Sequence, residues 1–132
     1  MGILNVLEDR YNGVEEAYIY VMEFVFRTKT GYKTLYKVGI TRNKPIDRML
    51  EIVRSFFTGR RYIPECRLVR YRKLPHFLKK EKEVHTELIE FNYKFNSSFS
   101  GSTEFFDIDI DKLLFVYENI CPKIEKDLRS RK

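Results

Sequence analysis

The chain has 132 residues, of which 43% are hydrophobic and 33% are charged, and its formal net charge is +6. The length predicts one domain, and the composition excludes a disordered chain, because 11 Phe and 9 Tyr stand against only 6 Gly and 4 Pro. No run of about 18 apolar residues occurs, which argues against a membrane-spanning helix.

The positive charge is concentrated in the middle of the chain. Residues 41–80 carry 12 basic and 3 acidic side chains, a net charge of +9, whereas residues 1–40 are neutral and residues 81–132 carry −3. A basic segment interleaved with Tyr, Phe and Thr is typical of proteins that bind polyanions. An ordinary solvated surface explains the same pattern about equally well.

The cysteines indicate a reducing compartment. Cys66 and Cys121 are the two cysteines, and the chain has no CxxC motif. A cytoplasmic protein with two free thiols is therefore expected. The abundance of Phe, Tyr, Lys and Ile hints at an AT-rich viral or phage gene, for which the compartment would be the cytoplasm of the host cell.

The first half of the chain predicts a β-hairpin. Residues 17–27 are rich in β-branched and aromatic side chains, as strands are. Thr28 to Gly31 has the composition of a turn, and Gly31 tolerates a positive φ. Residues 33–40 predict a second strand that pairs antiparallel with the first.

After the hairpin, helical and extended segments alternate. A helix is expected to run to about residue 57, with Asn43 as its N-cap and Pro45 in its first turn. A strand over residues 65–72 and a helix over residues 75–92 follow.

The last part of the chain predicts a short extended segment over residues 104–108 and a helix over residues 109–128 with a kink at Pro122. The order of elements predicts a single α+β domain over residues 1–132. Its expected architecture is a three-stranded antiparallel sheet flanked by helices. The core covers about residues 17–108, and the C-terminal helix follows it.

The helix expected over residues 75–92 carries an acid on its apolar face. Phe77, Glu81, Val84 and Leu88 follow helical spacing and so share one face. A carboxylate there is costly unless it is paired, hydrogen-bonded or bound to a metal ion. Two interpretations stay open: Glu81 pairs with a buried arginine and fixes the fold, or it is a metal ligand at the floor of a cleft.

Five motifs, in this order along the chain, resemble the GIY-YIG nuclease superfamily. They are Tyr18-Ile-Tyr20-Val, Tyr36-Lys-Val-Gly39-Ile-Thr, Arg48, Glu81-Lys-Glu-Val-His85 and Gly101-Ser-Thr-Glu104-Phe-Phe. The pattern is most similar to the phage- and fungus-associated branch, and Tyr18 stands where the family pattern has a glycine. The resemblance covers about residues 17–108. It implies the fold predicted above and an endonuclease that uses Mg²⁺ or Mn²⁺.

The resemblance also implies a role for each matching residue. Gly39, at the end of the second strand, leaves room beside the catalytic surface. Arg48 binds the scissile phosphate and stabilises the charge that develops in the transition state. Glu81 is the metal ligand, and Tyr20 positions or deprotonates the attacking water.

Three further positions have open roles. The tyrosine of the second motif falls on Lys37 here, because Tyr36 is one residue too early and points to the other face of the sheet. Lys37 would either contact phosphate or act as a base whose pKa is lowered by Arg48. His85 would orient water or phosphate, and Glu104 would be a second acid of the site or an ion-pair partner of Arg48.

The leading hypothesis is a metal-dependent endonuclease that hydrolyses phosphodiester bonds in DNA, with RNA as the alternative nucleic acid. Five basic side chains are expected to contact the backbone: Arg42, Lys44, Arg54, Arg60 and Arg61. One alternative is a catalytically inactive module of the same fold that binds nucleic acid or a host protein. A purely structural ion pair between Glu81 and Arg48 is the other. No separate DNA-reading domain is visible, so specificity would come from a homodimer or a targeting partner.

Overall fold

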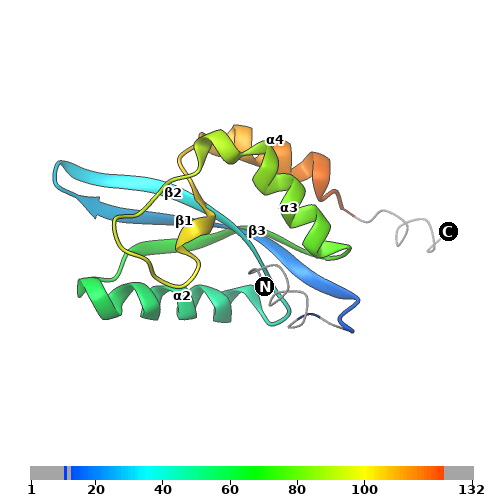
Figure 1. Cartoon of the computed structure of the whole chain (residues 1–132), viewed down its shortest axis with the longest axis horizontal. Helices are drawn as coiled ribbons and strands as arrows, with labels where there is room; N and C mark the ends of the chain where they lie inside the picture. Colours follow the sequence, from blue (N-terminus) through cyan, green and yellow to red (C-terminus); the bar gives the residue numbers. More distant parts are fainter. Residues whose placement is uncertain (1–10, 12, 124–132) are drawn as a thin grey trace.

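An antiparallel sheet with helices on both faces forms the computed structural model of the chain, which describes Tyr11 and residues 13–123 (Figure 1). The strands are β1 (Glu16–Thr28), β2 (Gly31–Thr41), β3 (Glu65–Pro75) and β4 (Phe105–Phe106). The helices are α2 (Pro45–Arg60), α3 (Phe77–Glu87) and α4 (Ile110–Ile120), with two 3₁₀ turns, η1 (Ile89–Phe91) and η2 (Ser102–Glu104). Figure 1 shows α2 on one side of the sheet and α3 with α4 on the other.

The sheet has four strands in the order β3-β1-β2-β4. The predicted antiparallel hairpin is confirmed, because β1 pairs with β2 along its length up to the turn at Gly31. The prediction of three strands is wrong by one. Phe105 and Phe106 pair with Lys37 and Tyr36 and so add β4 to the free edge of β2. A two-residue strand is too short for any periodicity to reveal it.

The central strand β1 is buried on both faces, so the sheet separates two apolar cores. On the α2 side, Met22, Phe24 and Phe26 of β1 pack with side chains of α2 and with a cluster of aromatic rings. On the other side, Ile19 and Val21 pack against α3 and α4. Successive residues of a strand point to opposite faces, which places each member of the strand in one core or the other.

The ends of helix α2 differ from the predicted ones. Helix α2 begins at Pro45 with Lys44, not Asn43, as its N-cap, and Asn43 instead donates its backbone N–H to Thr41 Oγ1 at 3.2 Å. A proline at the first helical position is favourable because its missing N–H would have no partner there. The helix ends at Arg60, where Arg61 adopts the left-handed conformation with φ of 60°.

The last two helices are shorter than predicted. The helix expected over residues 75–92 divides into α3 and η1, and α4 ends at Ile120. Pro122 therefore follows the helix and does not kink it. The remainder of the predicted C-terminal helix, residues 124–128, lies outside the described residues. Within the described part of the chain, no helix has both the length and the apolar character needed to cross a membrane.

Candidate metal and phosphate site

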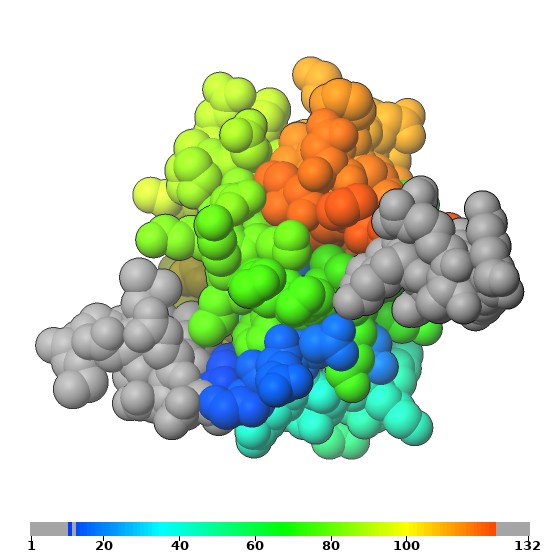
Figure 2. Space-filling model, turned by 90° about the vertical axis from the view of Figure 1, so that its right-hand side faces the viewer, coloured from blue at the N-terminus to red at the C-terminus, as the bar shows by residue number. Residues whose placement is uncertain are grey.

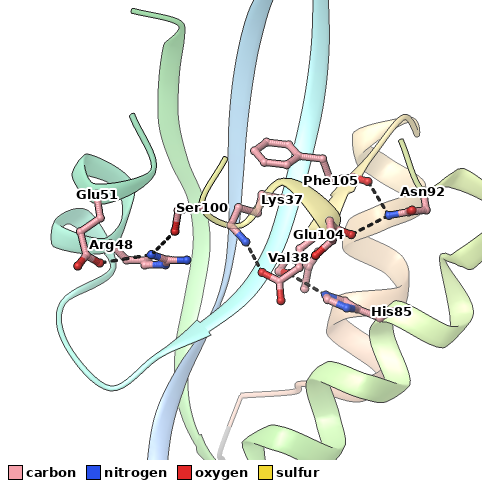
Figure 3. Close-up of polar contacts among 10 residues, drawn as sticks. Lys37, Val38, Arg48, Glu51, His85, Asn92, Ser100, Glu104 and Phe105 are labelled. Carbon is pink, nitrogen blue, oxygen red and sulfur yellow. Dashed lines mark hydrogen bonds and ion pairs between the residues drawn. The ribbon is translucent and has the colours of Figure 1, made fainter. Parts of the chain in front are cut away.

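The candidate site lies at the edge of β2, just beyond the short strand β4. Because β4 pairs only with Tyr36 and Lys37, the following residues of β2 border α3 and η2 instead of another strand. His85 of α3 reaches this edge, with Nε2 2.7 Å from the carbonyl oxygen of Val38. Figure 3 shows His85, Lys37, Glu104 and Arg48 converging there from four different elements or loops.

Two carboxylates and one imidazole form a compact cluster within this site. Glu81, His85 and Glu104 each offer a ligand atom, and these atoms lie within 4.8 Å of one another. Glu81 is 7% exposed, and its Oε2 has no hydrogen-bond partner. Every other buried side-chain oxygen or nitrogen of the described residues has one. An unpartnered buried carboxylate oxygen is unfavourable, and a bound cation would relieve it.

The two acids of the cluster have opposite pKa shifts. Burial, reinforced by the charge of Glu104, raises the pKa of Glu81 to about 8. Burial also acts to raise the pKa of Glu104, but the ammonium group of Lys37 outweighs it, so the pKa of Glu104 is lowered. In the absence of a cation, Glu81 is therefore largely protonated at neutral pH while Glu104 is ionised.

His85 is held against the edge of β2 by a backbone contact. Its Nε2 lies at hydrogen-bond distance from the Val38 carbonyl oxygen, which can only accept, so Nε2 carries the proton and Nδ1 is unprotonated in the neutral ring. Burial lowers the pKa of His85, which favours this neutral form. A histidine whose second nitrogen donates to a backbone carbonyl is oriented as metal-binding histidines commonly are.

Lys37 is fully buried and forms an ion pair with Glu104. Burial acts to lower its pKa, but the negative charges of Tyr20, when ionised, and of Glu104 outweigh this, so the pKa of Lys37 is raised. The alternative of a base with a lowered pKa is therefore not supported in the metal-free protein, because it took Arg48 into account but not Glu104, 67 residues away. The prediction that Tyr36 points to the other face is confirmed, since it packs in the α3 and α4 core.

Gly39 provides the space for Tyr20. The two residues are partners in the β1–β2 pairing, and a Cβ on Gly39 would lie 2.4 Å from Tyr20 Oη and 2.7 Å from its Cζ. Tyr20 is 1% exposed, and burial raises its pKa despite the opposing charge of Lys37. Its hydroxyl is consequently protonated at neutral pH and available as a hydrogen-bond donor, not as a base.

Arg48 approaches the cluster from α2. Its Nη1 donates to Ser100 Oγ at 3.2 Å and lies 3.5 Å from Glu51 Oε1 (Figure 3). The predicted alternative of a buried ion pair between Arg48 and Glu81 is wrong, because Glu81 has no ion-pair partner within residues 13–123. The negative charge of Glu104 lies close enough to Arg48 to favour the charged guanidinium, although the ion-pair partner of Glu104 is Lys37.

Two residues beside Arg48 and Lys37, Ser100 and Gly101, were given no role by the sequence prediction. Gly101 has φ of 81° and is the N-cap of η2, and a Cβ there would lie 2.9 Å from Lys37 Nζ and 3.5 Å from Arg48 Nη2. Gly101 therefore lets the loop pass directly over both cations. The motif Gly101-Ser-Thr-Glu104 contains this glycine, but only the loop geometry reveals which side chains the glycine touches.

The basic side chains predicted to contact nucleic acid fall into two groups. Arg42, Lys44 and Arg54 line a pocket of about 600 Å³ together with Arg48 and Lys73. Glu81 and Tyr20 do not line this pocket. The second group lies at the other end of α2 and consists of Arg60 and Arg61. Arg60 donates to the backbone oxygen and to Oγ of Ser97, both at 2.5 Å, and so holds the loop that contains Ser97.

Comparison with known proteins identifies one family. The model of the T5orf172 domain matches residues 17–121, which include every residue of the cluster and of the pocket described above. The curated proteins contain no match to the chain, and the solved structures contain none either. Because the match covers most of the sequence, the chain belongs to the T5orf172 domain family, a family related to the GIY-YIG domains.

Proposed function

We propose that the protein is a metal-dependent endonuclease that hydrolyses phosphodiester bonds in DNA. The observation that carries the proposal is the buried, unpartnered Oε2 of Glu81, with Glu104 and His85 within reach of the same point. Membership of a GIY-YIG-related family and the basic pocket next to Arg48 support the same conclusion.

The donor set of the cluster fits a divalent cation. Glu81 and Glu104 would supply oxygen ligands, which Mg²⁺ and Mn²⁺ prefer, and His85 would supply a ring nitrogen. A bound ion would neutralise charge on a phosphate oxygen and lower the pKa of a water molecule.

The remaining side chains would act on the phosphate and the attacking water. Arg48, half-buried and held by Ser100, would bind the scissile phosphate and stabilise the added negative charge of the transition state. Tyr20 would donate a hydrogen bond that positions the water. Lys37 stays charged and would keep Glu104 ionised, which prepares that carboxylate as a ligand.

A second candidate function is a nucleic-acid-binding module without hydrolytic activity. The observation that favours it is the separation between the pocket and the cluster. Arg48 lines the pocket, whereas Glu81 and Tyr20 are almost fully buried and do not. In this case the cluster would stabilise the fold and the pocket alone would contact the backbone.

Incubation of the protein with supercoiled plasmid separates the two functions. The endonuclease should produce nicked circles with Mg²⁺ or Mn²⁺ and none in EDTA, and activity should return when the ion is added back. Binding to the plasmid in EDTA, without nicking under any metal condition, would instead support the binding module.

A further inference from the structure

Two tyrosines form an exposed aromatic surface beside the basic pocket. Tyr18 of β1 and Tyr71 of β3 lie edge to face, with ring centroids 5.8 Å apart. Tyr71 is 50% exposed and Tyr18 is half-buried. Neither has a role in the proposed hydrolysis, and a half-exposed aromatic pair buries little area for its size.

The pair lies on the same face of the sheet as Tyr20. Tyr18 lies two residues before Tyr20 on β1, and Tyr71 is the β3 partner of Tyr20. Side chains two residues apart on a strand share a face. The two rings therefore lie next to the buried Tyr20 on the same face of the sheet.

Tyr18 also forms a wall of the pocket that Arg48 lines. Lys73 places Nζ 5.7 Å from the centre of the Tyr18 ring, and Arg42 and Arg54 line the same pocket. Figure 2 looks onto this end of the molecule, where the blue residues at the beginning of β1 lie above the cyan residues around the start of α2. An aromatic wall and several cations thus surround one volume of about 600 Å³.

We propose that this pocket holds an unpaired nucleotide next to the scissile phosphate, with its base stacked on Tyr18, whose ring Tyr71 supports edge to face. The inference rests on the proposed function and specifies its substrate: DNA with a single-stranded segment at the cleavage point. Every base has a π face, so aromatic side chains bind unpaired bases with little sequence preference, and basic side chains hold the adjoining phosphates. In a continuous duplex, stacking on neighbouring bases competes with this contact.

Binding measured in EDTA tests the proposal without cleavage. The two probes are a blunt DNA duplex and the same duplex with a four-nucleotide single-stranded extension that contains 2-aminopurine. We expect wild type to bind the extended duplex on the order of tenfold more tightly and to quench the 2-aminopurine fluorescence. Equal affinity for the two DNAs, with no quenching, would overturn the proposal.

Substitutions assign the effect to the pocket. Tyr18→Leu should remove both the preference and the quenching, and Tyr18→Phe should retain both. The matched control is Tyr32→Leu, because Tyr32 is 77% exposed at the other end of the β1–β2 hairpin. A preference that persists in Tyr18→Leu and Tyr71→Leu would overturn the assignment.

The binding measurements in EDTA, together with plasmid nicking in the presence of Mg²⁺ or Mn²⁺, distinguish the failure of each proposal. If wild type binds and cleaves DNA but ignores the extension, the stacking site is wrong and the endonuclease stands. If wild type binds neither DNA, the proposed function is wrong and the stacking site is wrong with it.

Discussion

Two glycines determine which side chains fit into the candidate site. Gly39 allows Tyr20 to lie against β2, and Gly101 allows the loop before η2 to pass over Lys37 and Arg48. In both cases the constraint is the volume that a Cβ would occupy. At Gly101 a positive φ adds a second constraint.

Gly39→Ala should displace Tyr20 and impair the site. The new Cβ would lie 2.4 Å from Tyr20 Oη, and the hydroxyl is attached to a rigid ring that is almost fully buried. We expect a loss of about 1–3 kcal/mol in the free energy of unfolding, as for other overpacked cores, together with a loss of nicking activity. Denaturant unfolding and plasmid nicking measure the two effects.

Gly59→Ala is the matched control for that substitution. Gly59 lies in α2, and a Cβ there would meet nothing within 4 Å. Alanine should stabilise this helix position by about 0.5–1 kcal/mol. A Gly39→Ala variant as stable and active as Gly59→Ala would show that Tyr20 does not need the space.

The pH dependence of stability should identify the cation site through Glu81. Its pKa is raised to about 8, well above the ordinary value of 4.5, so the folded state holds a proton that the unfolded state has released. Stability in EDTA should therefore fall as the pH rises from about 4.5 to about 8. The window above about pH 7 is the cleanest, because the lowered pKa of His85 has no further effect there.

Glu81→Gln should remove this part of the pH dependence, as measured by melting temperature in EDTA. At about pH 8, added Mg²⁺ or Mn²⁺ should raise the melting temperature of wild type, because the ion binds only the folded cluster. The same addition should not change the melting temperature of the variant. A wild-type protein that is insensitive to both ions would contradict the metal site.

At the level of the elements, α4 is fixed to the sheet by one buried hydrogen bond. Tyr117, with no exposed surface, donates its hydroxyl to the carbonyl oxygen of Ile19 at 2.7 Å. The bond joins residues 98 positions apart and links the last described helix to the central strand. Asp109 holds the other end of α4 by accepting from the backbone N–H groups of Asp111 and Lys112.

Tyr117→Phe should destabilise the protein by about 1–3 kcal/mol, since it deletes the donor and leaves a buried carbonyl oxygen with one bond fewer. DNA affinity should be unchanged because the pocket lies on the other face of the sheet. Urea unfolding measures the effect, and Tyr32→Phe, at an exposed position, is the control. A stability equal to that of wild type would mean that the hydrogen bond is not a significant link.

The sequence predicted elements with strong periodicity and failed where distant residues decide the outcome. Helical spacing correctly predicted that Glu81 shares the buried face of Phe77 and Val84. The extended segment predicted over residues 104–108 contains β4, but its pairing with β2 was not predicted, because two residues carry no period. The alternative in which Lys37 is a base with a lowered pKa left out Glu104, which becomes its neighbour only through the tertiary fold.

At the scale of the whole molecule, the basic middle of the chain is divided by the fold. Arg42 and Arg54 line the pocket with Arg48, whereas Arg67, Arg70 and Arg72 form ion pairs with Glu23 or Glu118. Composition could not reveal this division, because only tertiary contacts determine which cations are paired. The net charge of +9 in residues 41–80 therefore overstates the charge available to DNA.

The salt dependence of DNA binding should identify the cations that contact phosphate. Each contact contributes a slope of about −0.9 in log K against log salt. Arg42→Ala with Arg54→Ala should reduce the slope by nearly two such contacts. Lys79→Ala with Lys82→Ala removes the same charge from α3, where both residues line a different pocket, and should leave the slope almost unchanged. Equal slopes for the two double variants would contradict the pocket as the DNA-binding surface.

The central claim is that a cation held by Glu81 is required for hydrolysis of DNA. The most direct measurement compares wild type with Glu81→Gln for plasmid nicking with Mg²⁺ or Mn²⁺ and for DNA affinity in EDTA. Glutamine keeps the size of the side chain but cannot ionise to become a carboxylate ligand. The Glu81→Gln variant should bind DNA as wild type does and should produce no nicked plasmid. A variant that nicks DNA at the wild-type rate would contradict the account.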